Sequence, residues 1–154
     1  MLRFTREKVD PSQFLQMICE KTSPNFFWSS DTRYENRNNR TIAVTISPWH
    51  RNAPVVAPMN VVFTKDISTN GICLICPFEI PDKEVVIGVY VEEMGVDEPL
   101  FFLFEIVRCV PFATGYWQIG GHAKEMLNTN FRKQMKQMGP QAKQLLVPTQ
   151  DSGQ

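Results

Sequence analysis

The 154-residue sequence lacks three things that would point to particular classes of protein. It has no net charge, because 16 lysines and arginines balance 16 aspartates and glutamates. This balance argues against a protein that coats nucleic acid or an anionic membrane by bulk charge. Its longest apolar runs, such as 85–91 and 100–104, are too short to cross a bilayer, and its charged N-terminus does not resemble a secretory signal. We therefore expect a cytoplasmic protein without a membrane span.

The sequence also has few metal-binding side chains, with four cysteines and two histidines. Cys73 and Cys76 have the spacing of a zinc or redox pair. However, the segment 71–76 is apolar and rich in β-forming residues, and residues three apart in a strand point to opposite faces. His50 and His122 are far away in sequence. We predict packing thiols in a reducing compartment and no metal site.

Most of the chain has the pattern of short β-strands. Six runs are separated by turn residues: 41–46, which Pro48 should end, 59–64, 72–76, 85–91, 100–110 and 116–119. No helix long enough for a parallel crossover lies between them. The pattern predicts an antiparallel β-barrel or β-sandwich.

Helical patterns flank these runs. Near the N-terminus, Asp10 can cap a helix that starts at Pro11 and places three apolar residues on one face: Phe14, Leu15 and Ile18. Ser23-Pro24 should end it, and the polar stretch 29–40 is a loop or arm. Near the C-terminus, Asn128 or Thr129 can cap a helix with a face made of Phe131, Met135 and Met138. We predict that this helix packs on the β-domain and ends at Gly139-Pro140, followed by a disordered tail, 148–154.

Two short motifs carry the functional prediction. Arg33 and Arg37 form an RxxxR motif in the polar arm, and a DxSxxG motif, Asp66, Ser68 and Gly71, lies in the turn between two predicted strands. Each motif is weak alone. The second can be only a turn, in which Asp66 and Ser68 bond nearby amides and Gly71 supplies a positive φ angle.

Together, in this order and 29 positions apart, the two motifs resemble the signature of the PilZ family of cyclic di-GMP receptors. The resemblance covers roughly residues 33–123. It implies a mainly β fold, a six-stranded antiparallel barrel with short flanking helices. The corresponding organisation is an N-terminal helical extension 1–30, a barrel 31–123 with a ligand-binding arm 29–40, and a C-terminal helix and tail 124–154. It also implies that five residues bind cyclic di-GMP: Arg33, Arg37, Asp66, Ser68 and Gly71. Arg40 is equally a third contact or a solvated charge.

The chemistry of these residues suits such a ligand. The planar fork of arginine pairs with guanine edges or phosphate oxygens and stacks on bases. A carboxylate such as that of Asp66 accepts hydrogen bonds from guanine N–H groups, and the Ser68 hydroxyl adds a polar contact.

We predict a receptor or adaptor that binds cyclic di-GMP, uses no cofactor and passes the signal to an unidentified effector protein. The arm 29–40 should become ordered when ligand bridges its arginines to the barrel. The sequence contains no catalytic set, so we do not expect an enzyme. One alternative is a nucleotide-independent PilZ-fold structural or pilus/motility adaptor. Another is a small oligonucleotide-binding barrel, which the zero net charge disfavours, so no nucleic acid polymer is expected as a partner.

Overall fold

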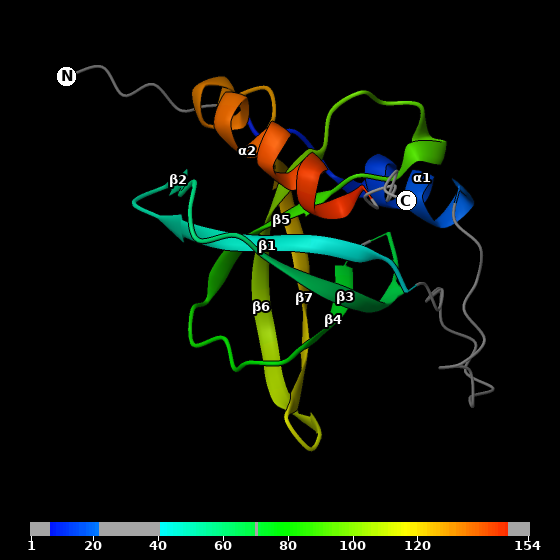
Figure 1. Ribbon diagram of the computed structural model, residues 1–154, viewed down its shortest axis with the longest axis vertical. Helices are drawn as coiled ribbons and strands as arrows, with labels where there is room; N and C mark the ends of the chain where they lie inside the picture. The colour runs from blue at the N-terminus through cyan, green and yellow to red at the C-terminus, as the bar shows by residue number, and fades with distance from the viewer. Residues whose placement is uncertain (1–6, 22–40, 70, 148–154) are drawn as a thin grey trace, which may run out of the picture.

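Six strands close an antiparallel barrel. The computed structural model describes residues 7–21, 41–69 and 71–147. The barrel strands are β1 (Ala43–His50), β3 (Asn60–Ile67), β4 (Gly71–Cys76), β5 (Glu84–Val89), β6 (Leu100–Ala113) and β7 (Tyr116–Met126). Their order around the barrel is β1-β3-β4-β7-β6-β5, and pairing between β1 and β5 closes the ring (Figure 1). The predicted six-stranded antiparallel barrel is confirmed.

The interior of the barrel is filled by alternate residues of the strands. Val44, Leu74 and Phe104 are examples, and each is fully buried in one apolar cluster. This follows from the two-residue period of a strand, which sends successive side chains to opposite faces. The alternation seen in the sequence is therefore the pattern of a barrel wall, with one face toward the core.

Helix α1 (Ser12–Lys21) covers one end of the barrel. As predicted, its apolar face is buried, and the Phe14 ring lies 6.0 Å from that of Phe102 at an angle of 62°. The backbone N–H of Ser12 donates to the Asp10 carboxylate at 3.0 Å, which confirms the expected cap. The Cys19 thiol donates to the Ile67 carbonyl at 3.6 Å, so this end of the barrel is the one at which β3 ends.

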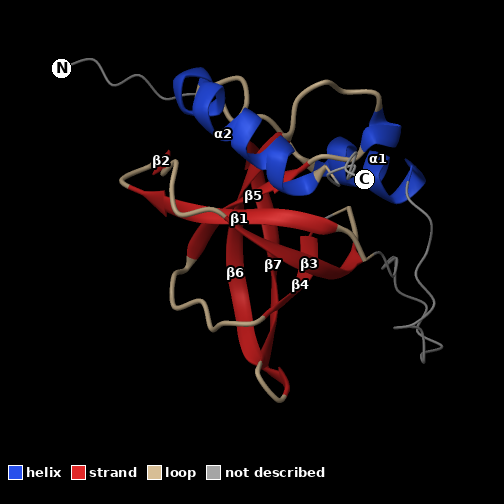
Figure 2. Cartoon of the chain, in the orientation of Figure 1, coloured by secondary structure: helices blue, strands red, loops and turns tan. Residues whose placement is uncertain are grey.

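Helix α2 (Arg132–Leu146) packs on the outside of the barrel. Met135 and Met138 join a second apolar cluster that includes Phe101 on β6, so the predicted packing of this helix is confirmed. Figure 2 shows both helices on the same side of the molecule, while the β6–β7 hairpin extends from the other. Asn128 does not cap α2. Its side chain accepts from the Phe101 N–H at 2.7 Å and thereby fixes the preceding loop to β6.

Two prolines do not end their elements, contrary to the sequence-based prediction. Pro48 lies inside β1 because it is paired with Val85 of β5, and the strand continues to His50. Pro140 lies inside α2, which continues to Leu146 because buried Ala142 holds its second half on the barrel. A proline removes one backbone donor, and tertiary packing outweighs that loss at both positions.

Two tight turns connect consecutive strands. Arg51 and Asn52 both have positive φ angles, 53° and 61°, and connect β1 to the short strand β2 (Ala53–Pro54). This geometry matches the right-handed twist of a two-residue hairpin. Gly115, with a φ of 82°, turns the long β6–β7 hairpin. Helix η2 (Glu92–Met94) lies between β5 and β6.

Three expectations from the sequence lie outside the described residues: the helix end at Ser23-Pro24, the arm 29–40 and the tail 148–154. Among the helices that the structure describes, none is both long enough and apolar enough to span a membrane.

Candidate functional site

The DxSxxG motif forms the hairpin between β3 and β4. The Ser68 backbone N–H donates to the Gly71 carbonyl at 2.9 Å. The Ser68 hydroxyl donates to the same carbonyl at 3.3 Å and accepts from the Gly71 N–H at 3.2 Å. These bonds hold the two ends of the turn together, so Ser68 has a structural role in this hairpin.

Gly71 has a different role from the one that a turn requires. The described glycines with positive φ are Gly95 and Gly115, so the expectation of a positive φ at Gly71 is wrong. Gly71 is instead the first residue of β4, and a Cβ atom there would collide with the backbone carbonyl of Gly121 on β7. Glycine is needed at this position because β4 and β7 approach each other too closely for a side chain to fit between them.

Asp66 lies at the end of β3, where an irregularity in the register between Thr64 and Asp66 shifts the pairing with β4. It is buried, with 8% of its surface exposed. It is paired with Cys73, whose neighbours Ile72 and Leu74 belong to the interior cluster while Cys73 does not. Because successive residues of a strand alternate between faces, Asp66 and Cys73 face the outside of the barrel.

Strand register extends this pair into a row across the outer face. Cys73 is paired with Gly120 of β7, and Gly120 is paired with Arg108 of β6. Residues paired directly across strands share one face. The row Asp66, Cys73, Gly120 and Arg108 crosses three strand spacings, about 14 Å. It has a carboxylate at one end and an exposed guanidinium at the other.

The row has no side chain at Gly120. Nothing lies within 4 Å of the position that a Cβ atom of Gly120 would occupy. A buried carboxylate, a glycine with open space above it and an exposed arginine therefore follow one another along the outer face. Sequence reasoning missed Arg108 because only the strand register brings a residue 42 positions from Asp66 onto the same row.

Aromatic and charged side chains surround the row. Phe63, two strand positions before the β3 irregularity, is 52% exposed, and Phe112 on β6 is 38% exposed. The Lys65 ammonium lies 5.9 Å from the centre of the Phe112 ring. We call this surface, defined by Asp66, Gly120, Arg108, Phe63 and Phe112, the outer β3–β6 face. It offers hydrogen-bond acceptors, cations and exposed ring faces, which suit a planar, polar, anionic ligand.

The described residues on either side of the RxxxR motif lie near this surface. Arg33, Arg37 and Arg40 lie outside the described residues. The segment that contains them joins α1 on one side and β1 on the other. Next to α1's end, Cys19 contacts Ile67. Before β1, the Ile42 N–H donates to the Thr64 hydroxyl at 2.9 Å, and the Thr64 N–H donates to the Ile42 carbonyl at 3.0 Å.

Both attachment points thus lie beside the last residues of β3, next to Asp66. Four Cα–Cα steps separate Arg37 from Thr41, a reach of at most about 14 Å. This distance is similar to the width of the outer β3–β6 face, so Arg37 is within covalent reach of Asp66.

The two cysteines of the CxxC sequence lie on opposite faces of β4, as the strand prediction requires. Cys76 is fully buried in the interior cluster and Cys73 is paired on the outer face. Burial, with smaller contributions from Cys109 and Cys73, raises the pKa of the Cys76 thiol to about 12. A thiol with this pKa stays protonated at neutral pH and is a poor nucleophile and metal ligand. The described part of the chain has no group of three or more metal-ligating side chains.

Comparison with known proteins finds no matching family model, no matching curated protein and no matching solved structure.

Proposed function

We propose that this protein is a PilZ-type receptor that binds cyclic di-GMP on the outer β3–β6 face and passes the signal to an effector protein in the cytoplasm. The observation that carries the proposal is the position of the attachment points described above. The segment with Arg33 and Arg37 leaves and re-enters the described chain beside Asp66. Two motifs that are 29 positions apart in sequence are thereby within reach of one ligand.

In this proposal, the arm and the barrel contribute different chemical groups to the ligand site. The arm contributes Arg33 and Arg37, whose guanidinium groups pair with phosphate oxygens or guanine edges. The barrel contributes the Asp66 carboxylate as an acceptor for guanine N–H groups. The barrel also contributes Arg108, a cation on the same row as Asp66. The free energy of binding must also offset the entropy lost when the arm is fixed, about 1–2 kcal/mol per residue.

Titration calorimetry with cyclic di-GMP tests the proposal. Arg33→Ala and Arg37→Ala should each weaken binding about 10- to 100-fold, because a charge-assisted hydrogen bond contributes roughly 1.5–3 kcal/mol. Arg132→Ala, an exposed arginine at the start of α2, is the matched control and should bind as the wild type does. GTP and single-stranded DNA should bind weakly or not at all. Wild-type affinity in both arm variants would refute the assignment of the arginines.

One observation favours a second candidate function. The Ser68 hydroxyl donates one hydrogen bond and accepts another inside the hairpin, as expected for a structural turn. A nucleotide-independent adaptor with the same fold is consistent with this arrangement. The two candidates differ in the same titration, because such an adaptor shows no heat of binding with cyclic di-GMP while it remains folded.

A further inference from the structure

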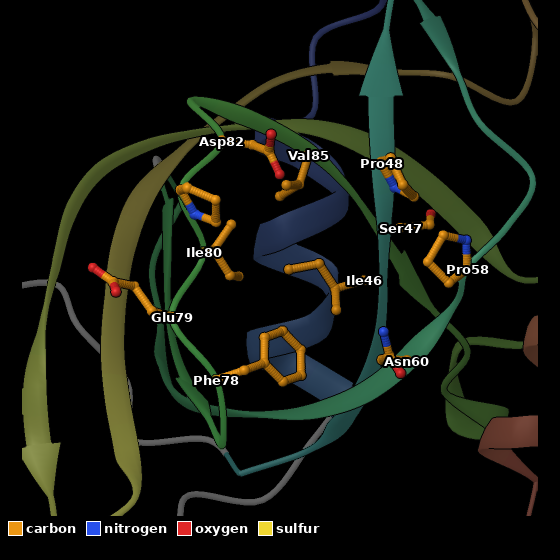
Figure 3. Close-up of a pocket in the computed structure, with 11 residues that line it drawn as sticks. Ile46, Ser47, Pro48, Pro58, Asn60, Phe78, Glu79, Ile80, Asp82 and Val85 are labelled. Carbon is orange, nitrogen blue, oxygen red and sulfur yellow. The ribbon is translucent and has the colours of Figure 1, made fainter.

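The barrel is open at the end opposite to α1, and this end contains a cavity of about 180 Å³. Figure 3 looks into the cavity, with α1 visible beyond the strands. Three buried apolar side chains, Ile46, Ile80 and Val85, line its walls, and each is at most 7% exposed. The cavity contacts Asn60, the first residue of β3. Asp66 lies near the other end of that strand, about 20 Å away, so the two sites are separate.

The rim of the cavity is stiff. Three of its lining residues are prolines, namely Pro48, Pro58 and Pro81. Proline has a fixed φ angle, so these segments lose little backbone freedom when something binds. Binding to a preformed site of this kind therefore loses less favourable free energy to the ordering of the protein backbone.

The polar groups of the cavity select for a cation. The Asp82 carboxylate lies beside Val85 at one side of the opening, and the Phe78 ring lies at the other side, below Ile46 and Ile80 in this view, whereas Glu79 points away (Figure 3). None of the described residues that line the cavity is basic. Phe78 is 36% exposed, so a face of its ring is available. An arginine suits an opening that has an aromatic ring and a carboxylate at its edge, because its aliphatic stem packs against the ring and its guanidinium bonds to the carboxylate.

The size of the cavity restricts the occupant further. Pockets for drug-sized ligands and cofactors have volumes of about 300–1,000 Å³, so this one suits a single side chain. An arginine has an apolar stem for the aliphatic walls and a guanidinium for the rim. We propose that the open end of the barrel is a docking pocket for one arginine side chain of a partner protein.

The test follows backbone amide signals of the full-length protein by nuclear magnetic resonance during titration with N-acetyl-arginine methylamide. Signals of Ile46, Ser47, Asp82 and residues 78–80 should shift with a dissociation constant in the millimolar range, as expected for one side chain. N-acetyl-norleucine methylamide has a similar apolar stem without the charge and should bind several-fold more weakly. Butylguanidinium represents a free small molecule and should bind no more tightly than the capped arginine.

Two variants test whether the Asp82 carboxylate binds the guanidinium group. Asp82→Asn should weaken binding of the arginine compound about three- to fivefold, the size of effect that a partly exposed ion pair produces. Asp97→Asn removes an exposed carboxylate outside the cavity and should leave binding unchanged. Equal binding of the norleucine compound, an equal loss in both variants, or shifts at other residues only would each overturn the proposal. Tighter binding of butylguanidinium would also overturn it, because the pocket would then take a free small molecule.

Discussion

Gly71→Ala, with Gly120→Ala as its matched control, tests the close approach of β4 and β7. Both glycines lie in the same pair of strands, where Gly71 is paired with His122 and Gly120 with Cys73. A methyl group on Gly71 would collide with the Gly121 carbonyl oxygen and lie 3.2 Å from its carbon. A methyl group on Gly120 would meet nothing within 4 Å. The two variants add the same group to the same sheet and differ in the space around it.

The expected magnitude follows from what the methyl group meets. Overpacking typically costs about 1–3 kcal/mol. At Gly71 the obstacle is backbone in a paired strand, which no change of rotamer can move, so we expect the upper part of that range, about 2–3 kcal/mol. For a domain of this size the melting temperature should fall by roughly 4–12 °C. Gly120→Ala should be neutral or stabilising by about 0.5–1 kcal/mol, because alanine loses less backbone entropy than glycine on folding.

Urea unfolding, followed by the fluorescence of the three tryptophans, measures both free energies. The midpoint should move to lower urea for Gly71→Ala with an unchanged m-value, which indicates a loss of native stability and not a changed unfolded state. Equal midpoints for the two variants would refute the reasoning. The glycine of the DxSxxG motif would then not be required by strand packing, and its role would have to lie in the ligand.

The remaining predictions concern buried hydroxyl groups and a buried thiol. Ser47, 2% exposed and paired with Val86 beneath α2, has a hydroxyl without a hydrogen-bond partner in the described chain. Ser47→Ala should therefore leave the free energy of unfolding unchanged or raise it by up to about 1 kcal/mol. Thr64→Val should lower it by about 1–3 kcal/mol, because the Ile42 N–H loses its acceptor. The same urea assay measures both variants, and a larger loss of stability in Ser47→Ala than in Thr64→Val would contradict the prediction. Cys76 should resist a disulfide reagent at pH 8 until the protein unfolds, because burial raises its pKa to about 12. Since its ordinary pKa is 9.0, the unfolded state releases this proton first, so stability should fall between about pH 9 and pH 12, and less so in Cys76→Val. Rapid labelling of Cys76 in the native protein would show that the thiol is accessible.

The sequence by itself predicted the six barrel strands and both helices, although not all of their ends. Alternation along Val44 and Ile46 predicted a strand with one buried face, and the spacing of Phe14, Leu15 and Ile18 predicted the apolar face of α1. These patterns are local, because the period of a helix or strand is a property of neighbouring residues. Of the motif residues that were predicted to lie in a turn between two strands, Ser68 is in the turn, whereas Asp66 belongs to β3 and Gly71 to β4.

Tertiary structure alone decided which residues share a surface. The row from Asp66 to Arg108 depends on the register of β3, β4, β7 and β6, which is set by packing between segments tens of residues apart. The same applies to Gly71, whose need for glycine comes from Gly121 on another strand. Pro48 and Pro140 remain inside their elements for a related reason. A local propensity against strand or helix is a matter of a few kcal/mol, and contacts with distant parts of the chain can exceed it.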